Sequence, residues 1–174
     1  GFHATSLKDL EKALDMRPGS IYAAFGSKDA LFQESLERYA RMALRELQRT
    51  LSGYDSPLLG LAAYLRQLGK LSEQELSCRA CLLVKSVLEL GEREHAARQK
   101  ANELLTGMEN CFTQQFTAAQ QLGELDTQYD PARLGRRFQA DVMGLRAFAQ
   151  RDVCSASVHA LAEDMAQSIE DLRS

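Results

Sequence analysis

The chain has 174 residues, of which 45% are hydrophobic, and its formal net charge is −3. This length and apolar content allow a buried core without disulfide or metal staples, and few prolines and β-branched residues favour an all-helical protein. No apolar run approaches the roughly 20 residues that span a membrane, and the cysteines are too sparse for a secreted disulfide scaffold. We therefore expect a cytoplasmic all-α protein with reduced thiols and no membrane partner.

The beginning of the chain has the pattern of two short helices joined by a tight turn. Thr5 or Ser6 can cap the first helix through a side-chain oxygen. The apolar residues that follow at helical spacing are Leu7, Leu10, Ala13 and Leu14. The turn is expected at residues 15–16. A second helix is expected to begin near Arg17, because Pro18 is acceptable only in the first turn of a helix.

The second of these helices has the composition of a helix that lies against DNA. Its expected apolar face consists of Ile21, Ala24 and Phe25. The outward positions are then Arg17, Gly19, Ser20 and Tyr22. A glycine permits close approach, and cationic or hydroxylated side chains can bond phosphates or base edges. An ordinary helical hairpin is the alternative that this pattern leaves open.

A longer stretch carries a family resemblance. The residues that carry it are Gly1 to Ser6, Pro18 to Tyr22, Phe25, and Ser27 to Leu31. In this order and spacing they resemble the DNA-binding region of TetR/AcrR-type bacterial transcriptional regulators. The resemblance implies a helix-turn-helix head and an upstream first helix that this sequence lacks. It also implies DNA contacts from Thr5, Ser6, Arg17, Gly19, Ser20, Tyr22 and Lys28. Charge adds little, because basic and acidic side chains nearly balance in residues 1–50.

The next helix connects the head to the rest of the chain. Ser27 is a good N-cap, an amphipathic stripe follows from Lys28, and the helix is expected to break at residues 52–53. A helix N-terminus binds phosphate through its free N–H groups, and Lys28 adds a positive charge there. A solvated surface lysine is the alternative. We expect a DNA-binding domain at 1–50 and a helical effector-binding and dimerisation domain at 51–174.

Five further helices are expected in the second domain. Their ranges are 57–69, 79–90, 93–122, 131–150 and 155–172. The helix at 79–90 is apolar almost all round and is expected to be central and buried on most sides. Gly107 and Gly123 are the candidate bend and stop of the longest helix, and Ser155 is the expected cap of the last. Eight helices result, or nine with the upstream helix that the resemblance implies.

No enzyme constellation is present in the sequence, and no cofactor or metal ion is expected. The histidines lie far apart, and neither a nucleophile elbow nor a phosphate-binding loop occurs. Cys78 and Cys81 form a single CxxC, so a zinc site would need further ligands such as His95 from elsewhere. A role for Cys81 as a small buried apolar residue is the simpler interpretation.

Cys81 also has a functional interpretation. Lys85 lies four residues further along the same expected helix, where an ammonium can favour the thiolate. The stretch 80–85 resembles the same region of TetR-type regulators that respond to electrophiles or oxidants. We therefore predict that Cys81 is the most reactive thiol of the chain and that its modification lowers operator affinity.

Large side chains in the second domain are candidates for an effector pocket. Together with Cys81 and Lys85, these are Tyr64, Met108, Phe112, Phe116 and Phe138. The second domain of the resembled family usually binds a small molecule, and such pockets are lined mainly by apolar side chains. Periodicity does not separate this interpretation from a plain hydrophobic core.

The last two helices are expected to pair with those of a second copy as a four-helix bundle. The predicted interface residues are Phe138, Val142, Gly144, Leu145, Val158, Leu161, Met165 and Ile169. The resemblance implies a one-component transcriptional repressor. Its homodimer would bind palindromic double-stranded operator DNA and be released by a small-molecule effector, or by an oxidant or electrophile. A helical ligand-binding or scaffold protein without DNA-binding activity is the alternative, and a small enzyme is a third.

Overall fold

The computed structural model describes residues 2, 5–70, 81–91 and 94–174. Within these residues the chain is all-helical, as the sequence predicts, and has no β-strand. The helices are α1 (Leu7–Ala13), α2 (Ser20–Phe25), α3 (Lys28–Leu51), α4 (Pro57–Gly69), α5 (Leu82–Glu89), α6 (His95–Gln121), α7 (Pro131–Phe148) and α8 (Ser155–Glu170). In this part of the chain no helix is long and apolar enough to cross a membrane.

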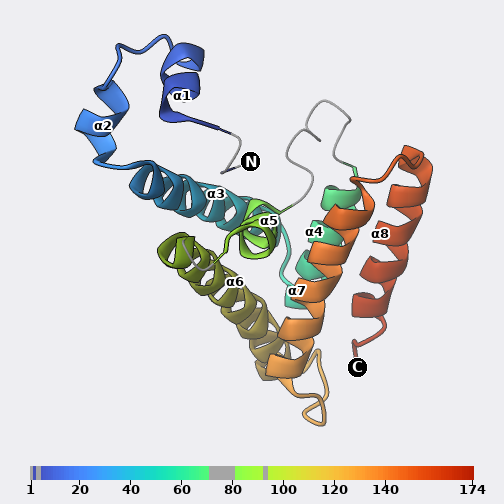
Figure 1. Ribbon diagram of the computed structural model, residues 1–174. Coiled ribbons are helices and arrows are strands. Elements are labelled where there is room, and N and C mark those ends of the chain that lie inside the picture. The colour runs from blue at the N-terminus through green and yellow to red at the C-terminus, as the bar shows by residue number, and fades with distance from the viewer. Residues whose placement is uncertain (1, 3–4, 71–80, 92–93) are drawn as a thin grey trace.

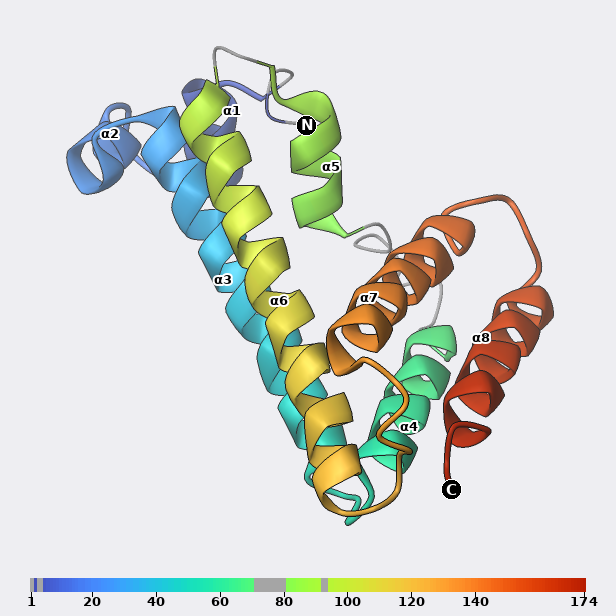
Figure 2. The same cartoon turned by 90° about the horizontal axis from the view of Figure 1, so that it is seen from below.

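The helices form a small head and a larger body (Figure 1). α1 and α2 make the head, which sits at the N-terminal end of α3. In the body, α3 and α6 run side by side away from the head (Figure 2). α6 also packs on α7 and α5, while α4 packs chiefly on α8. α3 therefore contributes to both parts and joins them without a break.

Side-chain caps fix the starts of α3, α4 and α7, and the first of them, Ser27, is the predicted cap of α3. The hydroxyl of Ser27 accepts a hydrogen bond from the Ala30 N–H at 3.0 Å, and Ser56 caps α4 in the same way. Asp130 accepts a hydrogen bond from the Ala132 N–H at 3.0 Å. Each cap satisfies a backbone donor that has no partner inside its helix, which stabilises the helix by about 1 kcal/mol.

The second helix of the head begins later than predicted. α2 starts at Ser20 rather than near Arg17, because Gly19 has a left-handed conformation with φ of 83° that interrupts the helix. Pro18 therefore lies in the connection between α1 and α2 and not in the first turn of α2. Ala24 was predicted on the buried face but is exposed, so Ile21 is the buried residue of α2.

The prediction for the helix at 79–90 is also wrong in part. The structure describes this helix from Leu82 onward, with Cys81 as its N-cap residue. It is not buried on most sides, since Leu88 is 80% exposed and Lys85 is exposed as well. The apolar run overstates burial because one side of α5 stays exposed. Leu83 and Ser86 are buried, whereas Leu82, Val84 and Val87 pack against the core but are only half-buried.

The remaining helix ends lie within two residues of their predicted positions. Gly123, with φ of 75°, ends α6 as expected, whereas Gly107 does not interrupt this helix. Ser155 is the first residue of α8 and not its cap. The N-cap position belongs to Cys154.

Aromatic rings from α6 and α7 form the centre of the body. Phe138 lies edge-on to Phe112 and Phe116, with ring centroids 4.8 Å and 6.1 Å apart. All three rings, and Tyr64 of α4, are at most 1% exposed. Edge-to-face pairs of this kind contribute about 1 kcal/mol each beyond the burial of their area. The rings thus hold α6 and α7 at a fixed separation.

A charge cluster joins α4 to α8 at the edge of this core. Arg66 Nε and Nη2 donate hydrogen bonds to the two carboxylate oxygens of Glu163 at 2.8 Å and 2.6 Å, and Arg66 Nη1 donates to Glu170. The hydrogen bonds to Glu163 and Glu170 raise the pKa of Arg66, and the bonds from Arg66 lower the pKa of Glu163. Gly69 allows close approach, since a Cβ atom there would lie 2.5 Å from the Cβ of Ala162.

We predict that Arg66→Met lowers the melting temperature at neutral pH and makes it less sensitive to acid. Because the pKa of Glu163 is depressed below 4.5 in the folded chain, its stabilising effect is present above that value and is lost as the pH falls through the folded-state pKa. The measurement is thermal unfolding by circular dichroism from about pH 7 to pH 3.

The control is Arg49→Met, which breaks a surface pair with Glu46 whose arginine side chain is 74% exposed. Its effect should be smaller, since exposed ion pairs contribute little. If Arg66→Met kept the acid sensitivity of the parent, the cluster would not stabilise the pairing of α4 with α8.

Candidate functional site

Local hydrogen bonds hold the start of the head. The Oγ of Ser6 accepts a hydrogen bond from the Asp9 N–H at 3.2 Å, and Asp9 Oδ2 accepts one from the Ser6 N–H at 2.8 Å. The Ser6 hydroxyl also donates to Asp9 Oδ2 at 2.6 Å, and these bonds lower the pKa of Asp9. Ser6 is a predicted DNA contact, but its hydroxyl is engaged within the head, where it caps α1.

The turn between α1 and α2 depends on Glu11, a residue that the sequence pattern does not single out. Glu11 is 7% exposed, and its Oε1 accepts a hydrogen bond from the Gly19 N–H at 2.7 Å. Its backbone carbonyl accepts another from the Met16 N–H at 2.8 Å. In the sequence Glu11 looks like any solvated acid of an amphipathic helix, so nothing local marks this contact.

The polar side of α2 faces a hollow between the two helices of the head. Of the predicted DNA contacts, Arg17, Gly19 and Tyr22 are exposed and Ser20 is half-buried. Tyr22, with 60% of its surface exposed, lines a hollow of about 870 Å³ together with Lys8 and Lys12 of α1. These two lysines are exposed and lie one turn apart, so they add positive charge to this face.

Lys28 also lines this hollow, but its ammonium has a partner inside the head, whereas Thr5 lies elsewhere. The Lys28 ammonium donates a hydrogen bond to the backbone carbonyl of Phe2 and lies 4.2 Å from the centroid of its ring. A phosphate contact would require the ammonium to leave this partner. Thr5 is half-buried beside a separate groove between α1, α3 and α5, so it does not share the hollow lined by Tyr22.

A second candidate site is a small cavity of about 20 Å³ inside the body. Four of the predicted pocket residues line it: Tyr64, Cys81, Met108 and Phe112. Phe116 and Phe138 do not line it, although Phe138 packs against Phe112, which does. Lys85 is exposed and borders the groove between α1, α3 and α5 instead. The cavity has room for about one water molecule, whereas pockets for drug-sized ligands hold about 300–1,000 Å³.

The cation at this cavity is Arg146 and not Lys85. Arg146 Nη1 donates a hydrogen bond to the Tyr39 hydroxyl at 3.1 Å, and both residues line the cavity with Cys81. Burial raises the pKa of Tyr39 to about 12, so its hydroxyl keeps its proton at neutral pH. The prediction that Lys85 favours the Cys81 thiolate has no support in this geometry, because Lys85 is exposed and lines the groove between α1, α3 and α5 and not the cavity.

The remaining thiols have different surroundings. Cys154 is exposed, its Sγ lies 3.2 Å from Ser157 Oγ, and hydrogen bonding with Ser157 lowers the pKa of Cys154. Burial raises the pKa of Cys111. Cys78, and with it the CxxC, lies outside the described residues. A bulky reagent would therefore reach Cys154 before the buried Cys81.

The predicted interface residues of α7 and α8 fall into two groups. Phe138, Val142, Leu145, Val158 and Ile169 are buried within one protomer. These side chains already fill the protomer core, so they are not available to a second copy. Leu161 and Met165 are half-buried, and Gly144 is exposed. A Cβ atom built at Gly144 would meet nothing within 4 Å, so its surroundings are open.

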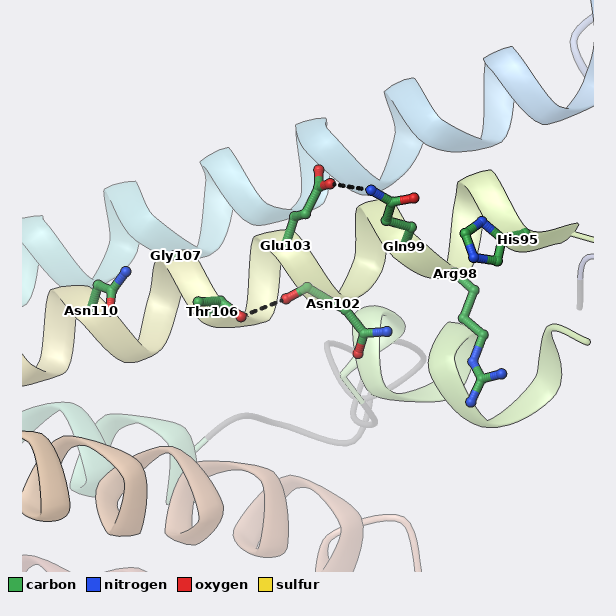
Figure 3. A pocket seen from close by; sticks show the side chains of 8 residues that line it. All are labelled: His95, Arg98, Gln99, Asn102, Glu103, Thr106, Gly107 and Asn110. Carbon is green, nitrogen blue, oxygen red and sulfur yellow. Dashed lines mark hydrogen bonds between the residues drawn. The ribbon is translucent and has the colours of Figure 1, made fainter. Parts of the chain in front are cut away.

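The outer face of α6 carries a polar hollow of about 640 Å³ that the sequence does not single out (Figure 3). The described residues that line this hollow are His95, Arg98, Gln99, Asn102, Glu103, Thr106, Gly107 and Asn110. Gln99 donates a hydrogen bond to Glu103 and Thr106 donates one to the Asn102 carbonyl, both at 3.0 Å. Across the described ranges, no three side chains of His, Cys, Asp or Glu are grouped to hold a metal ion. We interpret this hollow as a solvated helix face.

Family models match both parts of the chain. The model of bacterial regulatory proteins, tetR family, matches residues 1–35. The model of the Tetracyclin repressor-like, C-terminal domain matches residues 57–167. Among curated proteins, no sequence matches the chain.

Solved structures with a similar fold include three regulators. A transcriptional regulator of the TetR family from Cytophaga hutchinsonii has a TM-score of 0.88 at 20% identity, covering 99% of this chain and 86% of that chain. A cysteine mutant of the TetR family transcriptional regulator CifR, complexed with 26-bp double-strand operator DNA, has a TM-score of 0.86 at 28% identity, covering 97% and 88%. The reduced form of E. coli NemR has a TM-score of 0.77 at 23% identity, covering 100% and 89%.

We predict that Glu11→Ala loosens the head, and that Glu11→Gln, which keeps an acceptor oxygen, does so less. Without the carboxylate, the part-buried Gly19 N–H loses its partner, at a cost of about 1–2 kcal/mol. Hydrogen exchange should become faster across residues 7–25 in Glu11→Ala, while the core helices of the body keep the rates of the parent. Unchanged exchange in the head of this variant would show that the turn does not depend on Glu11.

Proposed function

Because the chain belongs to the TetR family of DNA-binding transcriptional regulators, we propose that it is a one-component repressor whose homodimer binds a palindromic operator. An effector in the body releases it by altering the spacing of the two heads. The observation that carries this proposal is the exposed polar face of α2 on a head joined to the body by one continuous helix. The mechanism is a coupling free energy between the operator site and the effector site.

The proposed DNA face consists of Arg17, Gly19 and Tyr22 with Lys8 and Lys12 beside them. Cations and hydroxyl groups donate to phosphate oxygens and fix the position of the protein on the duplex, and a glycine lets the backbone come close. CifR, with 28% identity and the same fold, has been seen on operator DNA. That complex supports the assignment of the head as the DNA-binding part of this chain.

We predict that Tyr22→Ala weakens operator binding about tenfold, as expected for a side chain at the centre of the contact surface. Lys8→Ala and Lys12→Ala should weaken binding to all DNA sequences alike. Each should reduce the slope of log affinity against log salt concentration by about one. The measurement is fluorescence anisotropy at several salt concentrations, on a palindrome selected from random DNA by the full chain. Arg45→Ala, an exposed cation far along α3, is the matched control and should bind like the parent.

Lys28→Ala distinguishes the two roles of that side chain. It should weaken binding only if the ammonium leaves Phe2 for a phosphate. If Tyr22→Ala and both α1 lysine variants bound like the parent, the DNA face would lie elsewhere. If no duplex were bound at all, a helical ligand-binding protein without DNA-binding activity would become the better assignment.

The dimer is proposed to form through the exposed sides of α7 and α8. Gly144 has open space around it within the protomer, which would let a partner helix approach closely. Leu161 and Met165, both half-buried, supply apolar surface on α8. A symmetric dimer of this kind presents its two heads to half-sites about one helical turn apart or slightly more.

We predict that Gly144→Arg separates the dimer at micromolar concentration, because it would place an unpaired charge in the interface. Gly107→Arg is the matched control, since both glycines lie inside helices, are exposed and have open space where a Cβ atom would stand. Sedimentation velocity measures the outcome. A monomeric parent, or a Gly144→Arg dimer as stable as that of Gly107→Arg, would argue against this interface.

The effector is proposed to act at the cavity lined by Tyr64, Cys81 and Met108. The cavity also touches Tyr39 of α3, the helix whose first turn carries the head. An effector that enlarges the cavity must displace α3 or its neighbours, because close-packed side chains leave no free volume to absorb it. Both a non-covalent ligand and a reagent that modifies Cys81 fit this mechanism.

A further inference from the structure

Arg146 is a cation that the body holds without an acidic partner among the described residues. It lies half-buried on α7, and its Nη1 donates a hydrogen bond to the Tyr39 hydroxyl at 3.1 Å. The ion pairs found in the described ranges belong to other arginines and to a lysine. A charge withdrawn from water is costly unless an opposite charge faces it. The cavity beside Arg146 therefore suits a ligand that brings a negative charge.

The two tyrosines that line the cavity with Arg146 do not supply this charge. Burial raises the pKa of Tyr39 to about 12. Burial also raises the pKa of Tyr64, and the nearby charge of Arg146 offsets this only in part. Both phenols therefore keep their protons at neutral pH. A phenol that accepts a hydrogen bond from arginine can still donate its own proton, so both tyrosines can donate to an anion at the cavity.

The acidic side chains nearest to this group have partners of their own. Glu46 of α3 acts on Tyr64, but its carboxylate forms an ion pair with Arg49 at 2.7 Å. On α7, Asp141 lies 4.0 Å from Arg137. Neither acid lines the cavity, and no other carboxylate of the described residues does so. The negative charge that would pair with the guanidinium must therefore come with a ligand.

The cavity limits what this ligand can be. Its volume of about 20 Å³ holds one water-sized group, and the flexible side chains of Met108 and Met143 can move to admit a few more atoms. Leu105, Phe112 and Val142 make the rest of this side apolar. A second charge on the ligand would be buried without a partner, which is costly. The lining therefore favours a small anion with a single charge and a short apolar part.

We propose that Arg146, Tyr39 and Tyr64 bind the carboxylate of a short-chain aliphatic monocarboxylic acid. The planar guanidinium can donate two parallel hydrogen bonds to the two oxygens of a carboxylate, a match that a spherical halide ion does not offer. The alkyl part of the ligand lies against Met108 and Val142, which line the same cavity. Binding is reversible and forms no covalent bond.

The regulatory consequence of this site rests on the proposed function. The hydrogen bond from Arg146 to Tyr39 joins α7 to α3, the helix that carries the head. A carboxylate at the guanidinium takes hydrogen bonds from both side chains and changes how the two helices are joined. The ligand would thus act on α3 through Tyr39, while its binding to the body does not require DNA.

The test is the binding of sodium propanoate to the full chain, measured by isothermal titration calorimetry at neutral pH and constant ionic strength. Propanamide, which has nearly the same shape but no charge, should bind at least about tenfold more weakly, because hydrogen bonds to a charged group are the stronger ones. Sodium chloride should also bind more weakly than propanoate. The mass of the intact protein after dialysis should be unchanged, as expected for a reversible ligand.

Variants assign the binding to the proposed side chains. Arg146→Met should lower the affinity for propanoate at least about tenfold, and Arg146→Lys, which keeps the charge but loses the planar fork, should lower it less. Tyr39→Phe removes one hydroxyl donor and should lower it about threefold. Arg137→Met is the matched control and should bind like the parent, since Arg137 lies on the same helix with its side chain 68% exposed.

Several results would overturn the carboxylate site. These are no binding of propanoate, equal affinity for propanoate and propanamide or chloride, and parent-like affinity in a folded Arg146→Met. Thermal unfolding shows whether each variant is folded. If Arg146→Met does not fold, parent-like affinity in both Arg146→Lys and Tyr39→Phe would overturn the site. Propanoate that binds as expected but leaves operator binding of the parent unchanged would support the site and overturn the effector role of the cavity.

Discussion

The two short helices of the head depend on α3 for their position, and this dependence links the head to the rest of the structure. α1 has seven residues and α2 has six, whereas isolated helices shorter than about 12 residues are marginal in water. The head is fastened to the start of α3, where the rings of Phe2 and Phe32 lie 4.9 Å apart. Its orientation is therefore set by a helix that belongs to the body.

Buried side chains and an ion pair hold α3 against the body. Leu36, Ala40 and Leu47 are buried in the core of the body, and Glu37 forms an ion pair with Lys100 of α6 at 3.1 Å. Tyr39, on the same helix, reaches the cavity. The same helix thus contacts both the cavity and the head, so the proposed coupling between them needs no other element.

The parts of the fold that sequence alone predicted are those with a local physical cause. A hydroxyl or carboxylate cap followed by a proline, as at Ser56-Pro57 and Asp130-Pro131, satisfies backbone donors within a few residues, so it can be recognised without a structure. The start of α2 differs from the prediction because Pro18 is compatible with a first helical turn, whereas the left-handed conformation of Gly19 is visible only in the structure. Hydrophobic spacing also placed Phe138 both at a pocket and at an interface, since periodicity shows that a side chain is buried but not against what.

The contacts that sequence alone did not predict join residues far apart in the chain. Glu11 reaches a backbone donor eight residues away, across a turn. Arg146 meets Tyr39, which lies 107 positions earlier, and replaces Lys85 as the cation near Cys81. A lysine one helical turn from a cysteine is visible in the sequence, but whether its ammonium faces the thiol depends on which side of the helix packs inward.

For an effector that binds at the cavity, as proposed, the small volume of the cavity makes the response threshold a property of side-chain packing. A ligand that binds only an opened form meets an apparent affinity reduced by the fraction of molecules that are open, so an open form present about 1% of the time weakens binding about 100-fold. Side chains that close the cavity, such as Met108, would then set the effector concentration at which half of the molecules respond. The same side-chain contacts stabilise the folded protomer. Tighter packing at these residues would therefore make the protomer more stable and less sensitive to the effector.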